Sequence, residues 1–556
     1  MTKSVLQIVR AKYRPILPVT LKGAVKIKQG KPTQSVADRE EIKKRFPNTY
    51  GLPVVTFERG RKKEEYPAIN VGVILSGGQA PGGHNVIAGL FDGIRKLNPQ
   101  SKLYGFLGGP SGLINNEVIE ITKEMLNSYR NTGGFDIIGS GRTKLEEIAQ
   151  FEAGLVNLQA KNIKALVIIG GDDSNTNACV LAEYYASINA GIQVIGCPKT
   201  IDGDLKNNMI ETSFGFDTAV KVYSELIGNI ERDANSAKKY WHFIKLMGRS
   251  ASHIALECAL QTQPNICLIS EEIEDKKKTL DAIVDDIATI VIKRSNDGNN
   301  FGVTLIPEGL LEFIPEMKTL IAELNKMLAD KTADGKNNPV SAAYKAISDN
   351  IERRDFVIAR LTPKSKKAFL SIPLDIALQL TLERDSHGNV QVSLIETEKL
   401  LGDLVKKKIN AINSKVKFST QYHFFGYEGR CAAPSNFDAN YCYALGYTAS
   451  VLIANGYTGY MASVRNTTVP AEKWIAGGIP ITMMMNIENR NGEDKPVIKK
   501  ALVELKGKPF KTFVANRERW AQNTEYVYPG PIQYFGPSNV CDQPTKTLKL
   551  ERTRKI

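Results

Sequence analysis

Two adjacent aspartates follow a glycine pair at the end of an apolar run, in ALVIIGGDDSNTNA from Ala165 to Ala178. Glycine turns of this kind can receive phosphate oxygens, because their backbone N–H groups point into the turn. Asp172 offers the oxygen ligand with which a protein can hold Mg²⁺ against a phosphate chain. A simpler interpretation of Asp173 is that it forms the N-cap of a helix beginning near Ser174. One aspartate is enough for a metal and one for a cap, so both interpretations stay open.

A second loop, PKTIDGDLKNN from Pro198 to Asn208, supplies residues for acid–base chemistry. Asp202 and Asp204 flank a glycine, and Lys199 stands just before them. A carboxylate close to a phosphate nest and a metal is a candidate general base for a hydroxyl nucleophile. The alternative is an Asp-Gly turn with solvated charges.

The glycine-rich stretch SGGQAPGGHN, Ser76 to Asn85, is a third candidate. It lacks the Lys-Ser or Lys-Thr of a Walker A loop and does not fit GxGxxG. Its backbone N–H groups, including those of Gly77 and Gly78, can still form a phosphate nest ahead of a helix N-terminus. A tight strand-to-helix turn that needs glycine for steric reasons is the alternative.

Three weaker candidates follow later apolar runs. MGRSASH, which begins at Met247, offers Arg249 to a phosphoryl group, PEG places Glu308 at a strand end, and YEGR joins Tyr427 to Arg430. A helix-capping or surface arginine would explain the first without any chemistry. Each of these stretches carries little information when it is taken singly.

The elements that must position these loops are apolar runs that end in glycine turns. They are Ile69–Gly78, Phe135–Lys144, Ile163–Ser174 and Ile192–Asp204. Continuous apolar strands that alternate with helical segments indicate a parallel sheet covered on both faces, so the fold class is α/β, doubly wound. Ligands of such sheets bind outside the carboxyl ends of the strands, and the loops should therefore converge on one crevice.

The rest of the chain suggests further parts. Residues 1–66 are polar, basic and proline-punctuated, and are expected to form an extension before the first domain. His242–Gly248, Asn265–Ser270 and Gly302–Gly309 are strand candidates for a second sheet. Apolar residues at three- and four-residue steps after Leu310 predict a mainly helical insertion over 311–419, with a loop at Lys331–Pro339.

Composition narrows the class of protein. With 556 residues, 42% of them hydrophobic and 24% charged, the chain is expected to be a multidomain globular protein. Seven scattered cysteines without a CxxC pair indicate reduced thiols in a cytoplasmic compartment. No apolar run is long enough to cross a membrane, and the N-terminus has no secretory pattern.

The net charge of +14 invites a nucleic-acid interpretation, but the basic runs are short and separate. They are Arg61–Lys63, Lys276–Lys278, Lys406–Lys408 and Arg552–Lys555. None of them interleaves with aromatic residues as a stacking platform would, so no nucleic-acid partner is expected. A small anionic substrate also suits a positive field.

Six motifs in this order resemble the phosphofructokinase family, and most closely its pyrophosphate-dependent members of the long type. They span roughly Ile69 to Asp438 and read SGGQAPGGHN, IIGGDDS, PKTIDGD, KKYWHFIKLMGRSASH, IPEG and GYEGRCAAPSNFD. The resemblance implies two doubly wound, Rossmann-like domains with a helical insertion. A donor-binding domain would cover 67–215 and be completed by about 430–490. A sugar-phosphate domain would cover 216–310 and be completed by about 420–429 and C-terminal segments.

The resemblance also implies roles for residues. Asp202 would take the proton from the C1 hydroxyl of fructose 6-phosphate, and Asp172 would bind Mg²⁺. Lys199 and Arg249 would be the cations around the transferring group. The pyrophosphate site would consist of Gly77, Gly78, Gly171, Asp173 and Lys199. The sugar phosphate would contact Thr200, Ile201, Asp202, Met247, Gly248, Arg249, Glu308, Tyr427 and Arg430.

Lys239 and Tyr240 would reach the sugar phosphate of a neighbouring subunit, which implies a homodimer or homotetramer. ATP-using bacterial relatives have arginine near this pair and histidine in place of Tyr427, so the contacts with the 6-phosphate are the least secure. ATP-using relatives also have glycine at the position of Asp173, and Asp173 together with Lys199 looks like the pyrophosphate signature. In physical terms, Asp173 would occupy the volume and carry the charge that the α-phosphate of a nucleotide brings.

Alternative activities remain at this stage. The chain could be an ATP-dependent phosphofructokinase, an enzyme that also accepts sedoheptulose 7-phosphate, or a non-catalytic regulatory subunit of the same fold. A regulatory subunit should lose the base or the metal ligand, whereas Asp172, Asp202 and Arg249 all stand in this chain.

Overall fold

The computed structural model describes residues 5–61, 64–330, 337–382, 384, 390–490, 493–531, 538 and 542–553. The chain divides into two compact units, each with a sheet of its own. The first comprises Met1–Val222, Tyr427–Ala501 and Ile532–Ile556, and the second comprises Tyr223–Gly426 and Leu502–Pro531. Several sequence expectations lie outside the described residues, namely Lys62 and Lys63, Lys331–Lys336 of the expected loop, Cys541, and Arg554 and Lys555.

The first unit is built on a ten-stranded sheet with the order β1-β2-β14-β13-β7-β6-β3-β4-β5, in which β8 pairs with β7. Its strands are β1 (Val25–Pro32), β2 (Pro53–Arg59), β3 (Asn70–Leu75), β4 (Lys102–Phe106), β5 (Val118–Glu120), β6 (Ile163–Gly170), β7 (Gln193–Thr200), β8 (Phe214–Gly215), β13 (Tyr460–Arg465) and β14 (Ile475–Pro480). The central strands β13, β7, β6, β3 and β4 are parallel, which confirms the predicted α/β class. Antiparallel strands extend this sheet at both edges.

Residues 1–66 belong to the first unit and do not form an extension before it, which corrects that expectation. Strand β2 buries Val55 and Phe57 and pairs with β14. The pairing is close, because a Cβ atom at Gly477 would lie only 2.1 Å from the carbonyl oxygen of Val55. Strand β1 lies at the sheet edge and is largely exposed.

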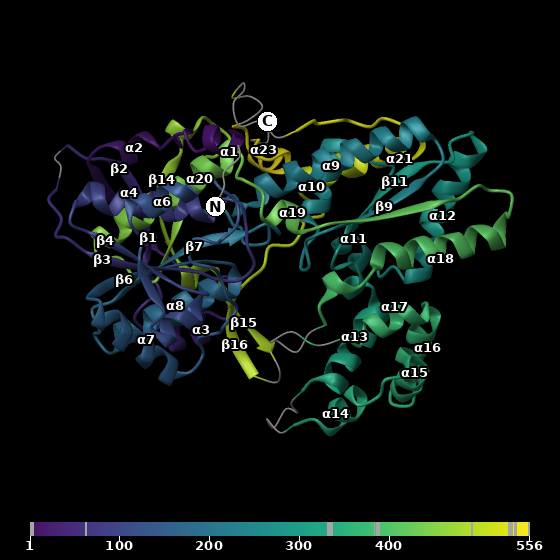
Figure 1. Ribbon diagram of the computed structural model, residues 1–556, viewed down its shortest axis with the longest axis horizontal. Helices are drawn as coiled ribbons and strands as arrows, with labels where there is room; N and C mark the ends of the chain where they lie inside the picture. Colours follow the sequence, from purple (N-terminus) through teal and green to yellow (C-terminus); the bar gives the residue numbers. More distant parts are fainter. Residues whose placement is uncertain are drawn as a thin grey trace. The chain divides into compact units, whose positions relative to one another are not determined.

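Helices cover both faces of the first sheet. In Figure 1, α4 (Gly83–Leu97) and α20 (Asn436–Ala454) lie on one side of it, and α7 (Ile148–Ala160) and α8 (Asp172–Ser187) lie on the other. Glycines let α4 and α20 approach closely, since a Cβ atom at Gly89 would meet the backbone of Tyr443. The other elements of this unit are α1 (Val5–Arg10), α2 (Val19–Lys22), α3 (Arg39–Arg45), α5 (Pro110–Asn115), α6 (Lys123–Tyr129), α19 (Tyr427–Arg430), α23 (Lys546–Arg552), and the hairpin of β15 (Met485–Arg490) and β16 (Glu493–Ile498).

The second unit holds a four-stranded parallel sheet with the order β10-β11-β9-β12. Its strands are β9 (Trp241–Leu246), β10 (Ile266–Cys267), β11 (Gly302–Pro307) and β12 (Thr420–Phe425). The three strand candidates of the second sheet are therefore confirmed. Trp241, Phe243 and Ile306 pack in one core with α12 (Leu280–Asn296) and α18 (Thr397–Ile412).

The described part of 311–419 folds into helices (Figure 1, teal to green). They are η1 (Leu310–Phe313), α13 (Pro315–Leu328), α14 (Pro339–Lys345), α15 (Asn350–Ile358), α16 (Pro363–Ser371), α17 (Leu374–Gln379), η2 (Val392–Leu394) and α18. The remaining helices that contribute to the second unit are α9 (Phe216–Ala237), which begins in the first unit, α10 (His253–Thr262), α11 (Ser270–Asp275) and α21 (Lys508–Gln522).

The stretch Phe135–Lys144, expected as a strand, is a loop with a single β-bridge from Gly141 to Ser76. The reason is that its backbone N–H groups donate to side chains and not to a neighbouring strand. Phe135 N donates to Gln79 Oε1 (3.1 Å) and Ile137 N donates to His84 Nε2 (3.4 Å), so side chains of the glycine-rich segment replace a ladder partner.

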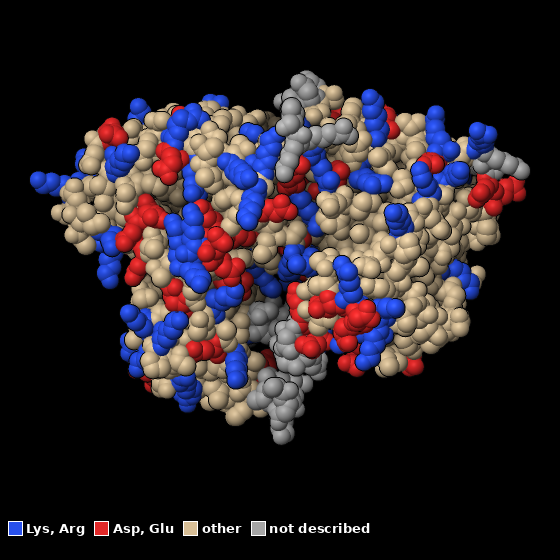
Figure 2. Space-filling model, turned by 180° about the vertical axis from the view of Figure 1, so that it is seen from behind, with Lys and Arg blue, Asp and Glu red and all other residues tan. Residues whose placement is uncertain are grey.

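Charge on the described surface is mixed. On the face in Figure 2, Lys and Arg side chains are interspersed with Asp and Glu side chains, without a continuous basic strip among the described residues. No helix of the described residues is long and apolar enough to span a membrane.

Candidate functional site

The order of the first sheet creates a crevice at its centre. The chain runs outward from β3 to β4 and then crosses back to β6 on the other side of β3. The point between β3 and β6 is therefore a topological switch point, where open α/β sheets bind ligands. The turns at Gly77 and Gly171 follow these two strands, and Ser76 Oγ accepts a hydrogen bond from Ser174 Oγ across the gap (2.8 Å).

Three cations surround the first glycine turn and form a cation cluster of Lys199, Arg142 and Arg430. Gly77 has a φ of +82°, and a Cβ atom there would lie 3.2 Å from Lys199 Nζ. A Cβ atom at Gly78 would lie 3.1 Å from Arg430 Nη1 and 3.7 Å from Arg142 Nη2. The backbone angle favours glycine at position 77, and the cations leave little room for a side chain at position 78.

Lys199 has an unusual electrostatic setting. It is 5% exposed, near the end of β7. Burial, together with the charges of Arg430 and Arg142, lowers its pKa to about 8, while Asp202 and Asp172 oppose the shift. An anion bound between these cations would relieve their repulsion, so the cluster is suited to phosphate oxygens.

A carboxylate, Asp172, directly follows the second glycine turn. Asp172 Oδ2 is buried and has no hydrogen-bond partner among the described residues, and its neighbouring cation is Lys500, with Nζ at 3.5 Å. Within the described part of the chain, no three His, Cys, Asp or Glu side chains gather to hold a metal by themselves. Mg²⁺ commonly uses one or two carboxylates and takes its remaining ligands from substrate phosphates and water. The oxygen of Asp172, which has no hydrogen-bond partner among the described residues and acts on Lys199 of the cation cluster, fits that mode of binding.

The doubled aspartate opens α8. The N-cap of this helix is Gly171, and Asp172 and Asp173 occupy its first two positions. The alternative of Asp173 as the N-cap of a helix beginning near Ser174 is therefore wrong, because the helix starts two residues earlier. The positive end of the helix dipole stabilises each of these carboxylates by about 0.3–1 kcal/mol.

The loop after β7 carries the candidate base. Asp202 N donates to Thr200 Oγ1 (3.0 Å), which shapes the loop, and Asp202 Oδ1 lies 3.7 Å from Arg430 Nη2. This oxygen is buried without a hydrogen-bond partner among the described residues. Burial and the nearby Asp202 and Asp172 raise the pKa of Asp204 to about 7. Ile201 is fully buried.

Two functional residues escaped the sequence analysis. Arg142 lies in Phe135–Lys144, for which the sequence analysis predicts only a strand and its turn. A cation directly after a glycine turn is the signal that could have identified it. Gln79 accepts from Phe135 N and Cys431 Sγ (3.5 Å), and its backbone oxygen accepts from Arg430 Nη1 (3.3 Å). It therefore ties the Arg142 loop to Arg430.

The second unit brings its own predicted residues together. Met247, Gly248 and Arg249 follow β9, and Glu308 follows the adjacent β11. Gly248 N donates to Glu308 Oε2 (3.1 Å), and Gly248 has a φ of +123°. These carboxyl-end loops form a second polar constellation that is held by the backbone.

Lys239 and Tyr240 lie elsewhere. They precede β9, so they stand at the opposite end of the strand from Met247, and a six-residue strand spans about 20 Å. The Lys239 ammonium lies over the ring of Tyr240, 5.0 Å from its centroid. One small substrate cannot touch both ends of β9 in the same subunit.

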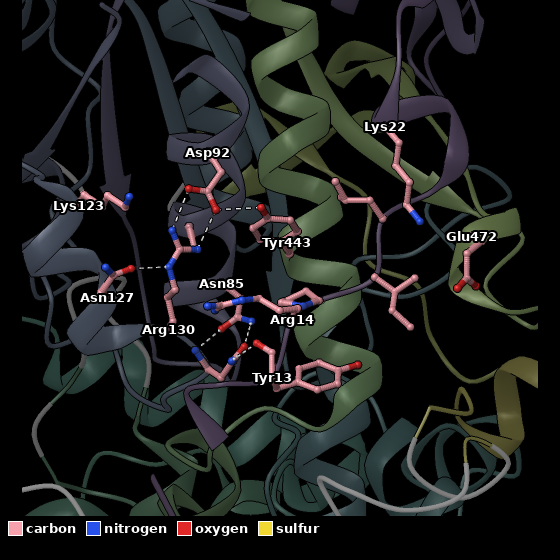
Figure 3. Close-up of a pocket in the computed structure, with 15 residues that line it drawn as sticks. Tyr13, Arg14, Lys22, Asn85, Asp92, Lys123, Asn127, Arg130, Tyr443 and Glu472 are labelled. Carbon is pink, nitrogen blue, oxygen red and sulfur yellow. Dashed lines mark hydrogen bonds and ion pairs between the residues drawn. The ribbon is translucent and has the colours of Figure 1, made fainter. Parts of the chain in front are cut away.

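A separate cavity of about 520 Å³ lies between the N-terminal segment Tyr13–Lys22 and helices α4, α6 and α20 (Figure 3). The Asp92 carboxylate accepts hydrogen bonds from both terminal nitrogens of Arg130 (2.8 Å each) and from the hydroxyl of Tyr443 (2.8 Å). The 15 described residues that line it include none of the site residues predicted from the sequence. This cavity is thus distinct from the crevice at the switch point.

Comparison with known proteins identifies relatives of the whole chain. A family model described as Phosphofructokinase matches residues 70–453. A pyrophosphate–fructose 6-phosphate 1-phosphotransferase from Porphyromonas gingivalis is 61% identical over 99% of this chain and 100% of that protein. A protein of the same name from Entamoeba histolytica is 54% identical, again over 99% and 100%. A solved pyrophosphate-dependent phosphofructokinase from Marinobacter aquaeolei has a similar fold, with a TM-score of 0.52 at 15% identity, covering 88% of this chain and 98% of that one.

Proposed function

The chain belongs to the phosphofructokinase family, and from that premise we propose that it transfers a phosphoryl group from pyrophosphate to fructose 6-phosphate. The products are fructose 1,6-bisphosphate and phosphate, and the reaction is reversible. The observation that carries the proposal is the cation cluster of Lys199, Arg142 and Arg430 around Gly77 and Gly78, with Asp172 near enough to act on the charge of Lys199. The names of the full-length relatives support the same activity.

The first unit supplies the donor site. Gly77, Gly78 and Gly171 provide turns open to phosphate oxygens, and the cation cluster neutralises their charge. When bound, Mg²⁺ would be held by Asp172 and would neutralise further charge on the phosphates. Asp173 disfavours a nucleotide as donor, because it stands where the α-phosphate of the nucleotide would lie.

Asp202 is the proposed base that takes the proton from the C1 hydroxyl. Its buried Oδ1 without a hydrogen-bond partner supports this role, because a hydroxyl arriving there finds an unused acceptor. Arg430 Nη2 lies 3.7 Å from this oxygen, so a cation stands beside the carboxylate where the proton would be taken. Thr200 and Ile201 lie in the same loop and complete this side of the sugar site.

The sugar phosphate also binds Met247, Gly248, Arg249, Glu308, Tyr427 and Arg430. Lys239 and Tyr240 serve the site of a second copy, which makes the enzyme a homodimer or homotetramer with shared sites. Their place at the far end of β9 supports that assignment. A cytoplasmic location is part of the proposal and agrees with described cysteines that form no disulfide.

The donor assay tests the activity. With fructose 6-phosphate and Mg²⁺ present, pyrophosphate is expected to support formation of fructose 1,6-bisphosphate, and ATP at the same concentration is expected to give less than a tenth of that rate. Equal rates would favour the ATP-dependent alternative. No product with either donor would indicate a regulatory subunit.

The pKa of Lys199 gives a pH prediction. Because burial lowers this pKa to about 8, the ammonium is present below pH 8 and lost above it. The affinity for pyrophosphate is therefore expected to fall by up to about tenfold between pH 7 and pH 9, relative to Lys199→Arg, whose cation persists. Calorimetric titration of both proteins with pyrophosphate and Mg²⁺ checks this, and parallel pH profiles would refute it.

A further inference from the structure

A cation from beyond the family-matched range of residues 70–453 reaches the donor site. Lys500 follows β16, and its Nζ lies 3.5 Å from Asp172 Oδ2. That oxygen is buried and accepts no hydrogen bond from any described residue. The Lys500 side chain is 32% exposed, so its ammonium lies at the boundary between the site and solvent.

Hydrogen bonds hold the backbone on both sides of Lys500 next to the donor site. Ile498 N donates to Thr176 Oγ1 in the first turns of α8 (3.2 Å), and Ala501 N donates to the carbonyl oxygen of Asp204 (2.7 Å). Lys499 N donates to the carbonyl oxygen of Met484 (2.9 Å). The position of Lys500 next to the opening of α8 is therefore built into the fold and does not depend on a flexible side chain alone.

We propose that Lys500 is a further donor-binding residue, which contacts pyrophosphate once a metal has taken Asp172. A divalent cation and an ammonium repel each other, so they do not share one carboxylate oxygen. A phosphate next to the metal offers the ammonium new acceptors, and lysine is a flexible point charge able to reach them. Pyrophosphate has no nucleoside to contribute contacts, so its affinity depends on such cations.

This inference rests on the proposed function and makes two opposite predictions for Lys500→Met. Pyrophosphate with Mg²⁺, titrated calorimetrically without fructose 6-phosphate, is expected to bind about tenfold more weakly, because one charge-assisted contact is lost. Mn²⁺ without any donor, followed by electron paramagnetic resonance, is expected to bind at least as tightly as in the wild type, because a competing cation has been removed.

Two variants control the test. Lys500→Arg keeps the charge and is expected to restore most of the pyrophosphate affinity. Lys499→Met removes the neighbouring lysine, which is exposed, and is expected to bind like the wild type. A thermal unfolding scan of each variant reports on the fold.

The outcomes separate the two proposals. Weaker pyrophosphate binding with unweakened Mn²⁺ binding supports the role of Lys500. Unchanged or tighter pyrophosphate binding by Lys500→Met overturns it, and so does a parallel loss of both affinities, which would mean that the substitution damages the site as a whole. A wild-type protein that does not bind pyrophosphate would instead overturn the proposed function.

Discussion

Replacement of Asp202 by serine is expected to lower turnover by about 10²–10⁴-fold while fructose 6-phosphate still binds. The C1 hydroxyl is a poor nucleophile unless a base accepts its proton during transfer. Asp202 has a buried oxygen without a hydrogen-bond partner among the described residues, and this oxygen lies 3.7 Å from Arg430 Nη2. A serine at this position cannot accept the proton at neutral pH, although it preserves a small polar side chain.

The measurement is turnover with pyrophosphate and Mg²⁺, together with calorimetric binding of fructose 6-phosphate to the same protein. A large fall in kcat with little change in sugar binding identifies a group that acts on the reaction and not on the ground state. Thermal unfolding controls for damage to the loop, which Asp202 N helps to shape through Thr200 Oγ1. Retained turnover would remove Asp202 as the base.

Replacement of Asp173 by glycine is expected to weaken the use of pyrophosphate and to admit ATP. Two unit charges about 4 Å apart repel by about 4 kcal/mol at an effective dielectric near 20. Half of that energy already disfavours a nucleotide α-phosphate by more than tenfold, since 1.4 kcal/mol is a factor of ten. Asp173 holds this charge at the second position of α8, directly after the proposed metal ligand.

A matched variant separates the two contributions of Asp173. Asp173→Asn keeps the volume and removes the charge, so it is expected to admit less ATP than Asp173→Gly if steric overlap contributes. The comparison of kcat/KM for ATP and pyrophosphate across the three proteins checks this. If the wild-type protein used ATP as well as pyrophosphate, Asp173 would not act as a donor filter.

Local patterns were sufficient to locate three of the five central strands, β3, β6 and β7, and their loops, but not β4 and β13. The apolar runs before Gly77 and Gly171 end close to the ends of β3 and β6, and the run before Lys199 ends two residues before the end of β7. The reason is that a buried parallel strand needs an apolar stretch whose length is visible in the sequence. The glycine turns and the polar residues after them were visible for the same reason. Motif order then indicated a family, which the comparisons confirm.

Tertiary pairing decided what local patterns cannot encode. Phe135–Lys144 has the composition of a strand, yet Gln79 and His84 satisfy its amides and leave Arg142 beside Gly78. Strand β2, which joins the edge strand β1 to the sheet, depends on a partner more than 400 residues away.

The sequence by itself therefore determined the fold class, the strands β3, β6 and β7 and the residue types at their carboxyl ends, since these depend on near neighbours along the chain. Only the tertiary structure decided which charges share the crevice. The lowered pKa of Lys199 and the approach of Lys500 to Asp172 arise from segments hundreds of residues apart, and electrostatic interaction depends on distance in space.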